Sequence, residues 1–524
     1  ALAALGIPAF QAETFDALAS LLASRRDAAS PELRTDHASL VDVLWKSGIS
    51  GNRPIVLISV FSLADLPLVR QMLTCHVYFV HKGIEADTVI LNEHRGGYLK
   101  TLEDEIDFLL RVHRESGLTH TNRMHSIRAD DLDMNEIRRL HATATVRIES
   151  GEGSLAEQVR AQSRSKSVKL PPLLAPEAAA KGKAFDAISR KWEPADGDGL
   201  EFWNGFGGYD RGSREYVIVP KGGVFPPAPW SNIVANEHVG FLATDRGMMF
   251  SWSRNSRDNK LTRAYNDPLS AETAEAMYVR DELTGEFYSP LPAVGARQAR
   301  YEVRHGEGYT EYRTHQGGLL IRLTVYVAAN ASIKYYSLSV KNDSAEARRL
   351  ALFGYFELLI GNFPHETKKQ LVFSLGEGNA LIARNAYRNV FTESRVFAGI
   401  SGGADQFTTN KEEFIGRFGS LAAPAALARQ GLSSRITPDG EPAAALCRRL
   451  TLASGEERTT VFYLGEASSV DALTFLLVNA CRGSDAQEAL RQAVSFWRSY
   501  PKLSFELPDR SLALLCNRFL SYQT

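Results

Sequence analysis

Three consecutive apolar runs joined by short polar connections constrain the fold of this chain more than any other feature. The runs are GLLIRLTVYVAA (318–329), IKYYSLSVKNDS (333–344) and RRLALFGYFELLIG (348–361). In the first run, Ile321, Leu323 and Val325 alternate with Arg322 and Thr324. A period of two places the apolar side chains on one face of a strand. The runs therefore predict antiparallel strands of a β-sandwich.

The part of the chain before residue 163 follows another pattern, in which short apolar runs alternate with amphipathic helical segments. PIVLISVF (54–61) and ADTVILNE (86–93) are continuous apolar runs, typical of strands buried on both faces of a parallel sheet. Between them, Asp65 is expected to cap a helix, and LEDEIDFLLRVHRES (102–116) is a second amphipathic helix. This alternation predicts a small α/β domain.

Changes in composition divide the chain further. A stretch rich in Lys, Pro and Ala has the composition of an exposed linker, and an all-β texture follows it. We expect a multidomain α+β fold in five segments. They are a helical segment (1–48), a small α/β domain with a parallel sheet (49–162), a linker (163–198), a large antiparallel β-sandwich (199–480) and a terminal helical linker (481–524).

Charge and cysteine usage exclude some classes of protein. Lys plus Arg is 60 and Asp plus Glu is 61, so no field of one sign favours nucleic acid as a partner. The cysteines are Cys75, Cys447, Cys481 and Cys516, spaced unlike a zinc site or a disulfide framework. Their spacing indicates a reducing compartment, so we expect a cytoplasmic location. The most apolar stretch, 54–69, is too short to span a bilayer.

Recognition-type side chains are densest between residues 202 and 267. Sugars are bound by aromatic rings that cover their C–H faces and by amides, carboxylates and guanidinium groups that pair with hydroxyls. The candidates for carbohydrate contact are Trp203, Trp230, Trp252, Arg254, Asn255, Arg257, Asp258, Asn259, Asn266 and Asp267. Alternatively, the tryptophans belong to the core and the polar residues shape long loops.

A catalytic carboxylate pair is the natural test for an enzyme that cleaves glycosidic bonds. Five acidic residues lie in or near the same region, but their spacing selects no pair: Asp258, Asp267, Asp281, Glu282 and Glu286. We expect no catalytic residue, no metal site and no cofactor in this chain. Because the chain begins with Ala1 and ends abruptly at Thr524, we also expect it to be a piece of something longer.

From Phe202 onward the chain resembles a known family. The motifs are FWNGFGGYDRGSREYVI, PPAPWSNIVANEHVGFLATDRG, FSWSRNSRDNKLTRAYNDP, YVRDELTGEFYSP and YEVRHGEGYTEYRTH. In this order they resemble the N-terminal, galactose-mutarotase-like sandwich of glycoside hydrolase family 94 phosphorylases, such as cellobiose and chitobiose phosphorylases, and the C-terminal part of cyclic β-1,2-glucan synthases. GISGNRPIVLISVFSLADLPLVRQ, VILNE and GSLAEQ resemble the connector before that domain in the synthases.

The resemblance implies that the catalytic machinery lies elsewhere. In the family the sandwich is followed by a helical linker and an (α/α)6 barrel that carries the catalytic Asp. LPDRSLALLCNRFLSYQT (507–524) looks like the entry helix of that barrel. The candidate residues can then face sugar or form the interface with the barrel. The parent protein would polymerise glucose from UDP-glucose, cyclise the glucan and adjust its chain length.

Three hypotheses follow. The first is a non-catalytic scaffold and carbohydrate-contacting region of a cyclic β-1,2-glucan synthase-like protein, at the cytoplasmic face of a bacterial inner membrane. The second is part of a soluble family 94 phosphorylase acting on β-linked gluco-oligosaccharides. The third is a protein-interaction module without sugar binding. The expected partners are a β-linked glucan and the missing barrel, and a homodimer is left open.

Overall fold

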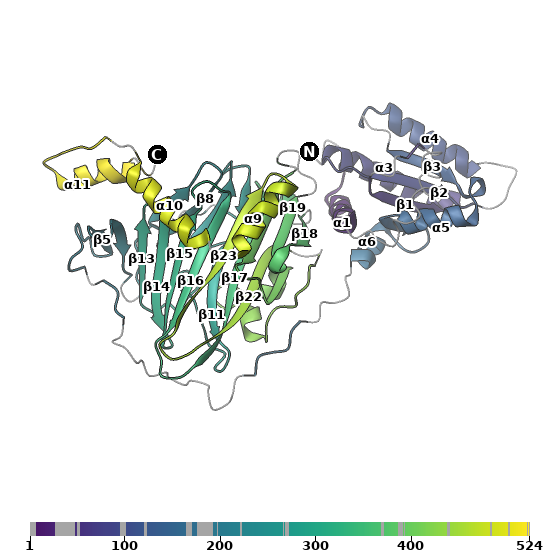
Figure 1. The fold of residues 1–524 in the computed structure, drawn as a ribbon. Helices are drawn as coiled ribbons and strands as arrows, with labels where there is room; N and C mark the ends of the chain where they lie inside the picture. The colour runs from purple at the N-terminus through teal and green to yellow at the C-terminus, as the bar shows by residue number, and fades with distance from the viewer. Residues whose placement is uncertain are drawn as a thin grey trace. The chain divides into compact units, whose positions relative to one another are not determined.

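The computed structural model divides the chain into two compact units, one formed mainly by residues 1–167 and the other mainly by residues 168–524 (Figure 1). The structure describes residues 7–26, 48–49, 53–94, 101–119, 123–163, 170–175, 192–195, 197–220, 223–265, 267, 272–367, 371–385, 391, 393–437, 441–482, 485–500, 503–520 and 522.

The first unit is a small α/β domain built on a four-stranded parallel sheet in the order β3-β2-β1-β4. Its elements are α1 (Ala9–Arg26), β1 (Ile55–Val60), η3 (Leu63–Asp65), α3 (Leu66–His81), β2 (Asp87–Asn92), α4 (Thr101–Glu115), β3 (Met124–Arg128), η4 (Ala129–Asp131), α5 (Met134–Thr143), β4 (Val146–Glu149) and α6 (Leu155–Ser163). Every residue of β1 is buried, as the continuous apolar run predicts.

The role predicted for Asp65 is wrong. Its carboxylate makes no cap hydrogen bond to α3 and instead accepts the N–H groups of Phe61 and Ser62, both at 2.8 Å. The reason is that the helical turn η3 begins before Asp65, with Ser62 as its N-cap, and Asp65 is the acidic third residue of its capping box. Asp65 therefore closes the short turn η3 that precedes the helix.

The second unit is a sandwich of two large antiparallel sheets. One has nine strands, with the path β12-β11-β17-β10-β9-β8-β7 and with β22 and β21 added beside β17; the other has ten strands in the order β18-β19-β20-β23-β16-β15-β14-β13-β6-β5. The strands are β5 (Gly207–Asp210), β6 (Glu215–Ile218), β7 (Ser231–Ala235), β8 (Val239–Thr244), β9 (Met248–Ser253), β10 (Lys260–Thr262), β11 (Glu275–Asp281), β12 (Phe287–Tyr288), β13 (Tyr301–Gly306), β14 (Tyr309–Gln316), β15 (Leu319–Val327), β16 (Ile333–Asn342), β17 (Arg348–Gly361), β18 (Leu371–Leu375), β19 (Leu381–Asn385), β20 (Arg395–Ile400), β21 (Gln406–Asn410), β22 (Pro442–Leu452) and β23 (Glu457–Ala467).

The two sheets face each other across a core that contains a buried ion pair. Lys334 on β16 and Glu275 on β11 are 2.5 Å apart, and both are fully buried. The hydroxyls of Ser251 and Tyr336 donate to the same carboxylate, each at 2.6 Å. The sheets are thus joined by charge as well as by apolar packing, because a buried charge must be paired.

Helices cover part of the sandwich. Figure 1 shows α9 (Val470–Arg482) and α10 (Asp485–Ser499) lying across the ten-stranded sheet, where they bury a cluster that includes Tyr326 and Leu477. The remaining elements are α7 (Pro364–Thr367), η6 (Glu377–Asn379), α8 (Lys411–Ile415), η7 (Ala425–Ala428), α11 (Arg510–Leu514) and η8 (Leu515–Leu520). The predicted fold class, a small parallel-sheet domain followed by a large antiparallel sandwich, is confirmed. The domain boundaries drawn from the sequence stay predictions.

Candidate functional site

Five of the predicted residues lie together on the turn between β9 and β10, here called the hairpin turn (254–259). The side-chain oxygen of Asn255 accepts the N–H groups of Arg257 and Asp258 at 2.9 and 2.8 Å. Asn259 is fully buried, and its amide donates to the carbonyl of Ser253 at 2.8 Å. The two amides therefore shape the turn, which is the structural alternative raised by the sequence.

Arg254 begins the turn and neutralises a buried carboxylate. Its backbone has a φ of 59°, and its guanidinium pairs with Glu466 at the end of β23. Glu466 is only 3% exposed and also accepts the hydroxyl of Ser253 at 2.6 Å. Because a buried carboxylate needs a counter-charge, this pair holds the hairpin turn against β23.

The outward side of the turn is formed by Arg257 and Asp258. Arg257 is 86% exposed, and its guanidinium lies 3.9 Å from the Asp258 carboxylate, which also accepts from Asn362 at 3.3 Å. Beside the turn, Trp252 is half-buried, with its ring 5.4 Å from that of Phe250. A guanidinium, a carboxylate and an indole are the groups that recognise sugar hydroxyls and C–H faces.

A close approach of the backbone fixes the indole of Trp252. Its ring packs over Gly240 of β8, where an added Cβ would lie 2.5 Å from Cζ2 of the indole. No side chain larger than that of glycine fits at this position without moving the ring. The indole is therefore held in one orientation beside the hairpin turn.

Trp230 lies away from the hairpin turn, in a cavity of about 420 Å³ that residues near the C-terminus help to line. The lining residues are Tyr216, Trp230, Ser231, Asn232, His305, Gly306, Arg518, Phe519 and Tyr522. The hydroxyl of Tyr522 accepts the N–H of Gly308 at 3.0 Å. Burial lowers the pKa of His305 to about 4, so its ring is neutral at pH 7. Trp230 thus stands where the C-terminal helical segment meets the sandwich.

The other candidates that the structure describes are Trp203 and Asp267. Trp203 is half-buried and its indole packs against Gly197. Asp267 is exposed, and Asn266 lies outside the described residues. The structure therefore brings together Trp252, Arg254, Asn255, Arg257, Asp258 and Asn259, and it separates them from Trp203 and Trp230.

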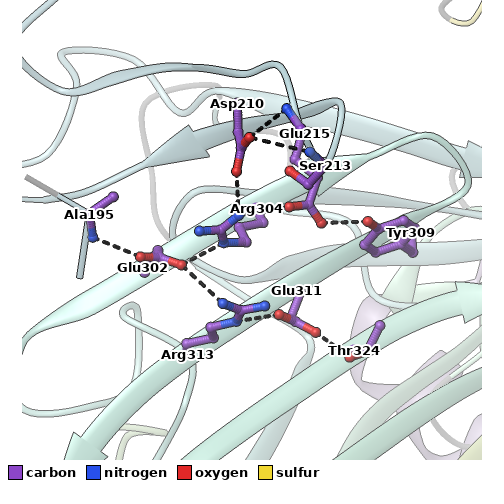
Figure 2. Close-up of polar contacts among 11 residues, drawn as sticks. Ala195, Asp210, Ser213, Glu215, Glu302, Arg304, Tyr309, Glu311, Arg313 and Thr324 are labelled. Atoms are coloured by element: carbon purple, nitrogen blue, oxygen red, sulfur yellow. Dashed lines mark hydrogen bonds and ion pairs between the residues drawn. The ribbon is translucent and has the colours of Figure 1, made fainter. Parts of the chain in front are cut away.

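A ladder of ionic side chains on β5, β6, β13 and β14 was not found by reasoning on the sequence (Figure 2). Arg304 lies at its centre, 2.8 Å from Glu215, 3.2 Å from Asp210 and 2.5 Å from Glu302. Burial opposes ionisation of Glu215, but hydrogen bonds from Tyr309 and Arg304 outweigh it and lower its pKa. The alternating charges of the YEVRHG run (301–306) were the available signal, since residues two apart share a face of a strand.

The acidic residues considered for catalysis are largely used in structural contacts. Asp281 is buried and lies 2.7 Å from Arg348, and Glu282 lies 2.5 Å from Arg280. Glu286 accepts the hydroxyl of Tyr288 at 2.8 Å. In the described part of the chain, His, Cys, Asp and Glu nowhere form a group of three that could hold a metal ion. No helix of the described ranges is both long and apolar enough to cross a bilayer.

Comparison with known proteins points to carbohydrate-active enzymes. Residues 214–480 match the family described as glycosyl hydrolase 94, supersandwich domain. The cyclic beta-(1,2)-glucan synthase NdvB of Rhizobium meliloti (strain 1021) is 31% identical over 492 residues, which cover 92% of this chain and 17% of the synthase. The N,N'-diacetylchitobiose phosphorylase of Vibrio furnissii is 24% identical over 50% of this chain and 33% of the phosphorylase.

Among solved structures, a bacterial glucoamylase complexed with acarbose is similar with a TM-score of 0.34 and 8% identity, over 54% of this chain and 40% of the glucoamylase. The chain spans 17% of the synthase that it matches and 33% of the phosphorylase.

Proposed function

The chain belongs to the glycosyl hydrolase 94 supersandwich family, and from that premise we propose that it is a non-catalytic scaffold and carbohydrate-contacting region of a cyclic β-1,2-glucan synthase-like protein. Its role is related to carbohydrate. We propose more specifically that it is a scaffold that contacts β-1,2-glucan while the parent protein controls chain length. We also propose the division of the chain into five segments that was predicted from the sequence.

One observation carries the choice of a synthase over a free-standing phosphorylase. The alignment with the synthase covers 492 residues, which exceeds the length of the sandwich unit from residue 168 to 524. It therefore extends into the α/β unit. The alignment with the chitobiose phosphorylase covers only 271 residues, or half of the chain. A protein whose likeness includes both units is a better guide to the whole chain.

Within this proposal the predicted residues have two different roles. Trp252, Arg257 and Asp258 contact glucan, because they present an indole and two charged groups beside the hairpin turn. Trp230 and the C-terminal segment (503–520) form part of the contact with the following catalytic barrel. The chain works at the cytoplasmic face of the bacterial inner membrane and contributes no catalytic residue of its own.

A titration tests the carbohydrate contact. Linear β-1,2-gluco-oligosaccharides are added to the chain while tryptophan fluorescence is followed, and we expect a saturable change that is lost in Trp252→Ala. The matched control is Arg211→Ala, an exposed arginine on the turn between β5 and β6, which should leave the titration unchanged. A wild-type chain that gives no response to these sugars would favour the interaction-module hypothesis instead.

The second hypothesis, a soluble phosphorylase fragment, is supported by the 24% identity with the chitobiose phosphorylase over half of this chain. This hypothesis accounts for half of the chain, whereas the first hypothesis accounts for 92% of it. Incubation with inorganic phosphate and sophorose should release no glucose 1-phosphate. Release of that product by the chain alone would contradict the non-catalytic role.

A further inference from the structure

A second cavity in the sandwich unit, of about 810 Å³, lies beside the end of β17 and the helix α8. Tyr265, Glu357, Lys411 and Phe418 are among the residues that line it. None of these residues belongs to the hairpin turn or to the Trp230 cavity. We call it the Phe418 cavity.

The floor of the Phe418 cavity is a fixed ionic cluster around Glu357, which is 4% exposed. Its carboxylate accepts from Arg263 at 2.9 Å, from the Tyr265 hydroxyl at 2.9 Å and from Lys411 at 3.0 Å. Burial and the Glu357 charge both raise the pKa of Tyr265, so the hydroxyl stays protonated and donates. A side-chain cluster whose members fix one another needs little ordering when a ligand binds.

The helix that borders the cavity is also held firmly. Phe414 of α8 stacks on Tyr355 of β17 with ring centroids 4.8 Å apart. The Asn410 side chain caps the helix by accepting the N–H of Glu413 at 3.1 Å. The helix that borders the cavity is therefore anchored to β17, and Phe418 lies on the exposed turn that follows it.

The rim carries an aromatic ring that the fold itself does not bury. Phe418 is 97% exposed, and its backbone lies in the left-handed region with a φ of 62°. A bulky residue in that region is strained, and such strain gathers at ligand sites. An exposed ring beside a polar cavity offers the flat apolar face on which a pyranose stacks.

The charges of the lining decide the class of ligand. Among the described residues that line the cavity, four are glutamates, one is a lysine and one is an arginine: Glu272, Glu357, Glu412 and Glu441, with Lys411 and Arg417. Lys411 is shared between Glu357 and Glu441, at 3.0 and 2.8 Å. An excess of carboxylates repels phosphate and accepts hydrogen bonds from hydroxyl groups. A neutral polyhydroxyl ligand fits, and a sugar phosphate does not.

We propose that the Phe418 cavity is a carbohydrate-binding site for a neutral pyranose unit, which stacks on Phe418 and donates hydroxyl hydrogen bonds to Glu412 and Glu441. The identity of the sugar as a β-1,2-linked glucose unit rests on the proposed function. The site adds a second contact with glucan on the sandwich, apart from the hairpin turn.

Isothermal titration calorimetry with linear β-1,2-glucotetraose tests the site. The wild-type chain should bind, and Phe418→Ala should bind about tenfold more weakly, the loss that about 1.4 kcal/mol of contact produces. The matched control is Phe475→Ala, since Phe475 is 68% exposed on α9 and does not line the cavity. Its affinity should equal that of the wild type. Glucose 1-phosphate should give no binding heat.

Each outcome decides between the two claims. Equal affinity of Phe418→Ala and wild type, with weaker binding by Trp252→Ala, overturns the cavity site and leaves the proposed function intact. Tight binding of glucose 1-phosphate overturns the charge argument and with it the site. Absence of any heat from the wild type with the tetrasaccharide overturns both. Because Phe418 is exposed, its replacement should not unfold the chain, and an unchanged thermal midpoint checks this.

Discussion

The hairpin turn and the Phe418 cavity each pair a buried glutamate with cationic side chains, and they differ in what they present to solvent. In the hairpin turn, Arg254 is committed to the buried Glu466, and the amides of Asn255 and Asn259 hold the turn itself. In the cavity, the buried Glu357 collects three donors beneath the surface, and Phe418 remains outward. The number of recognition-type residues in a segment therefore does not predict how many of them are available to bind a ligand.

The largest effect should come from the floor of the cavity. Glu357→Ala leaves Arg263, Tyr265 and Lys411 without their shared acceptor, which should cost about 2–3 kcal/mol of the free energy of unfolding. Urea denaturation measures this loss. Glu357→Gln keeps the volume and one acceptor oxygen, and it should cost less. An unchanged urea midpoint for Glu357→Ala would mean that Glu357 does not hold the floor of the cavity together.

A smaller loss is expected where the hairpin turn is held to β23. Glu466→Ala removes the partner of Arg254 and Ser253, and we expect a loss of about 1–2 kcal/mol because Arg254 is partly solvated. Glu237→Ala, on an exposed side chain in the turn before β8, is the control and should be neutral. If Glu466→Ala and Glu237→Ala unfold at the same urea concentration, the Arg254–Glu466 pair does not stabilise the fold.

The amide that shapes the turn should matter less again. Asn255→Ala removes the acceptor of two backbone N–H groups and should cost about 1 kcal/mol. Ser256→Ala, in the same turn, should change the unfolding midpoint little. A neutral Asn255→Ala would return this residue to the list of ligand contacts.

The smallest effect on stability belongs to the most exposed member of the turn. Arg257→Ala should change the free energy of unfolding by less than about 0.5 kcal/mol. The affinity of the Arg257→Ala variant for β-1,2-gluco-oligosaccharides should fall about threefold, because one solvent-exposed contact with the sugar is lost. Arg211→Ala should change neither quantity. A large stability loss for Arg257→Ala would mean that the outward side of the turn is structural too.

Local pattern was enough to predict much of the fold. The run from 348 to 361 is β17 with the same bounds, and the run from 333 contains β16. Strands with alternating or continuous apolar residues are predicted well, because the pattern of apolar residues directly reflects which side chains are buried. The Asp65 prediction failed because the helical turn η3 begins earlier, with Ser62 as its N-cap, and takes up the carboxylate in its own capping box.

The candidate site was harder to predict from the sequence, because its ion pairs and hydrogen bonds join residues that are far apart in the chain. Arg254 and Glu466 are 212 residues apart, and Glu357 and Lys411 are 54 apart. No spacing rule joins them, since strand pairing brings them together. Exposure also differs within one turn: Arg257 points outward while Asn259, two residues on, is fully buried.

The proposed function requires that this chain bind β-1,2-glucan without cleaving it. One NMR sample that contains the chain, linear β-1,2-glucotetraose and inorganic phosphate tests both halves. We predict saturation transfer from protein to sugar protons and a phosphorus spectrum that stays that of inorganic phosphate alone. A sample without saturation transfer would rule out glucan binding, and a growing glucose 1-phosphate signal would rule out the non-catalytic role.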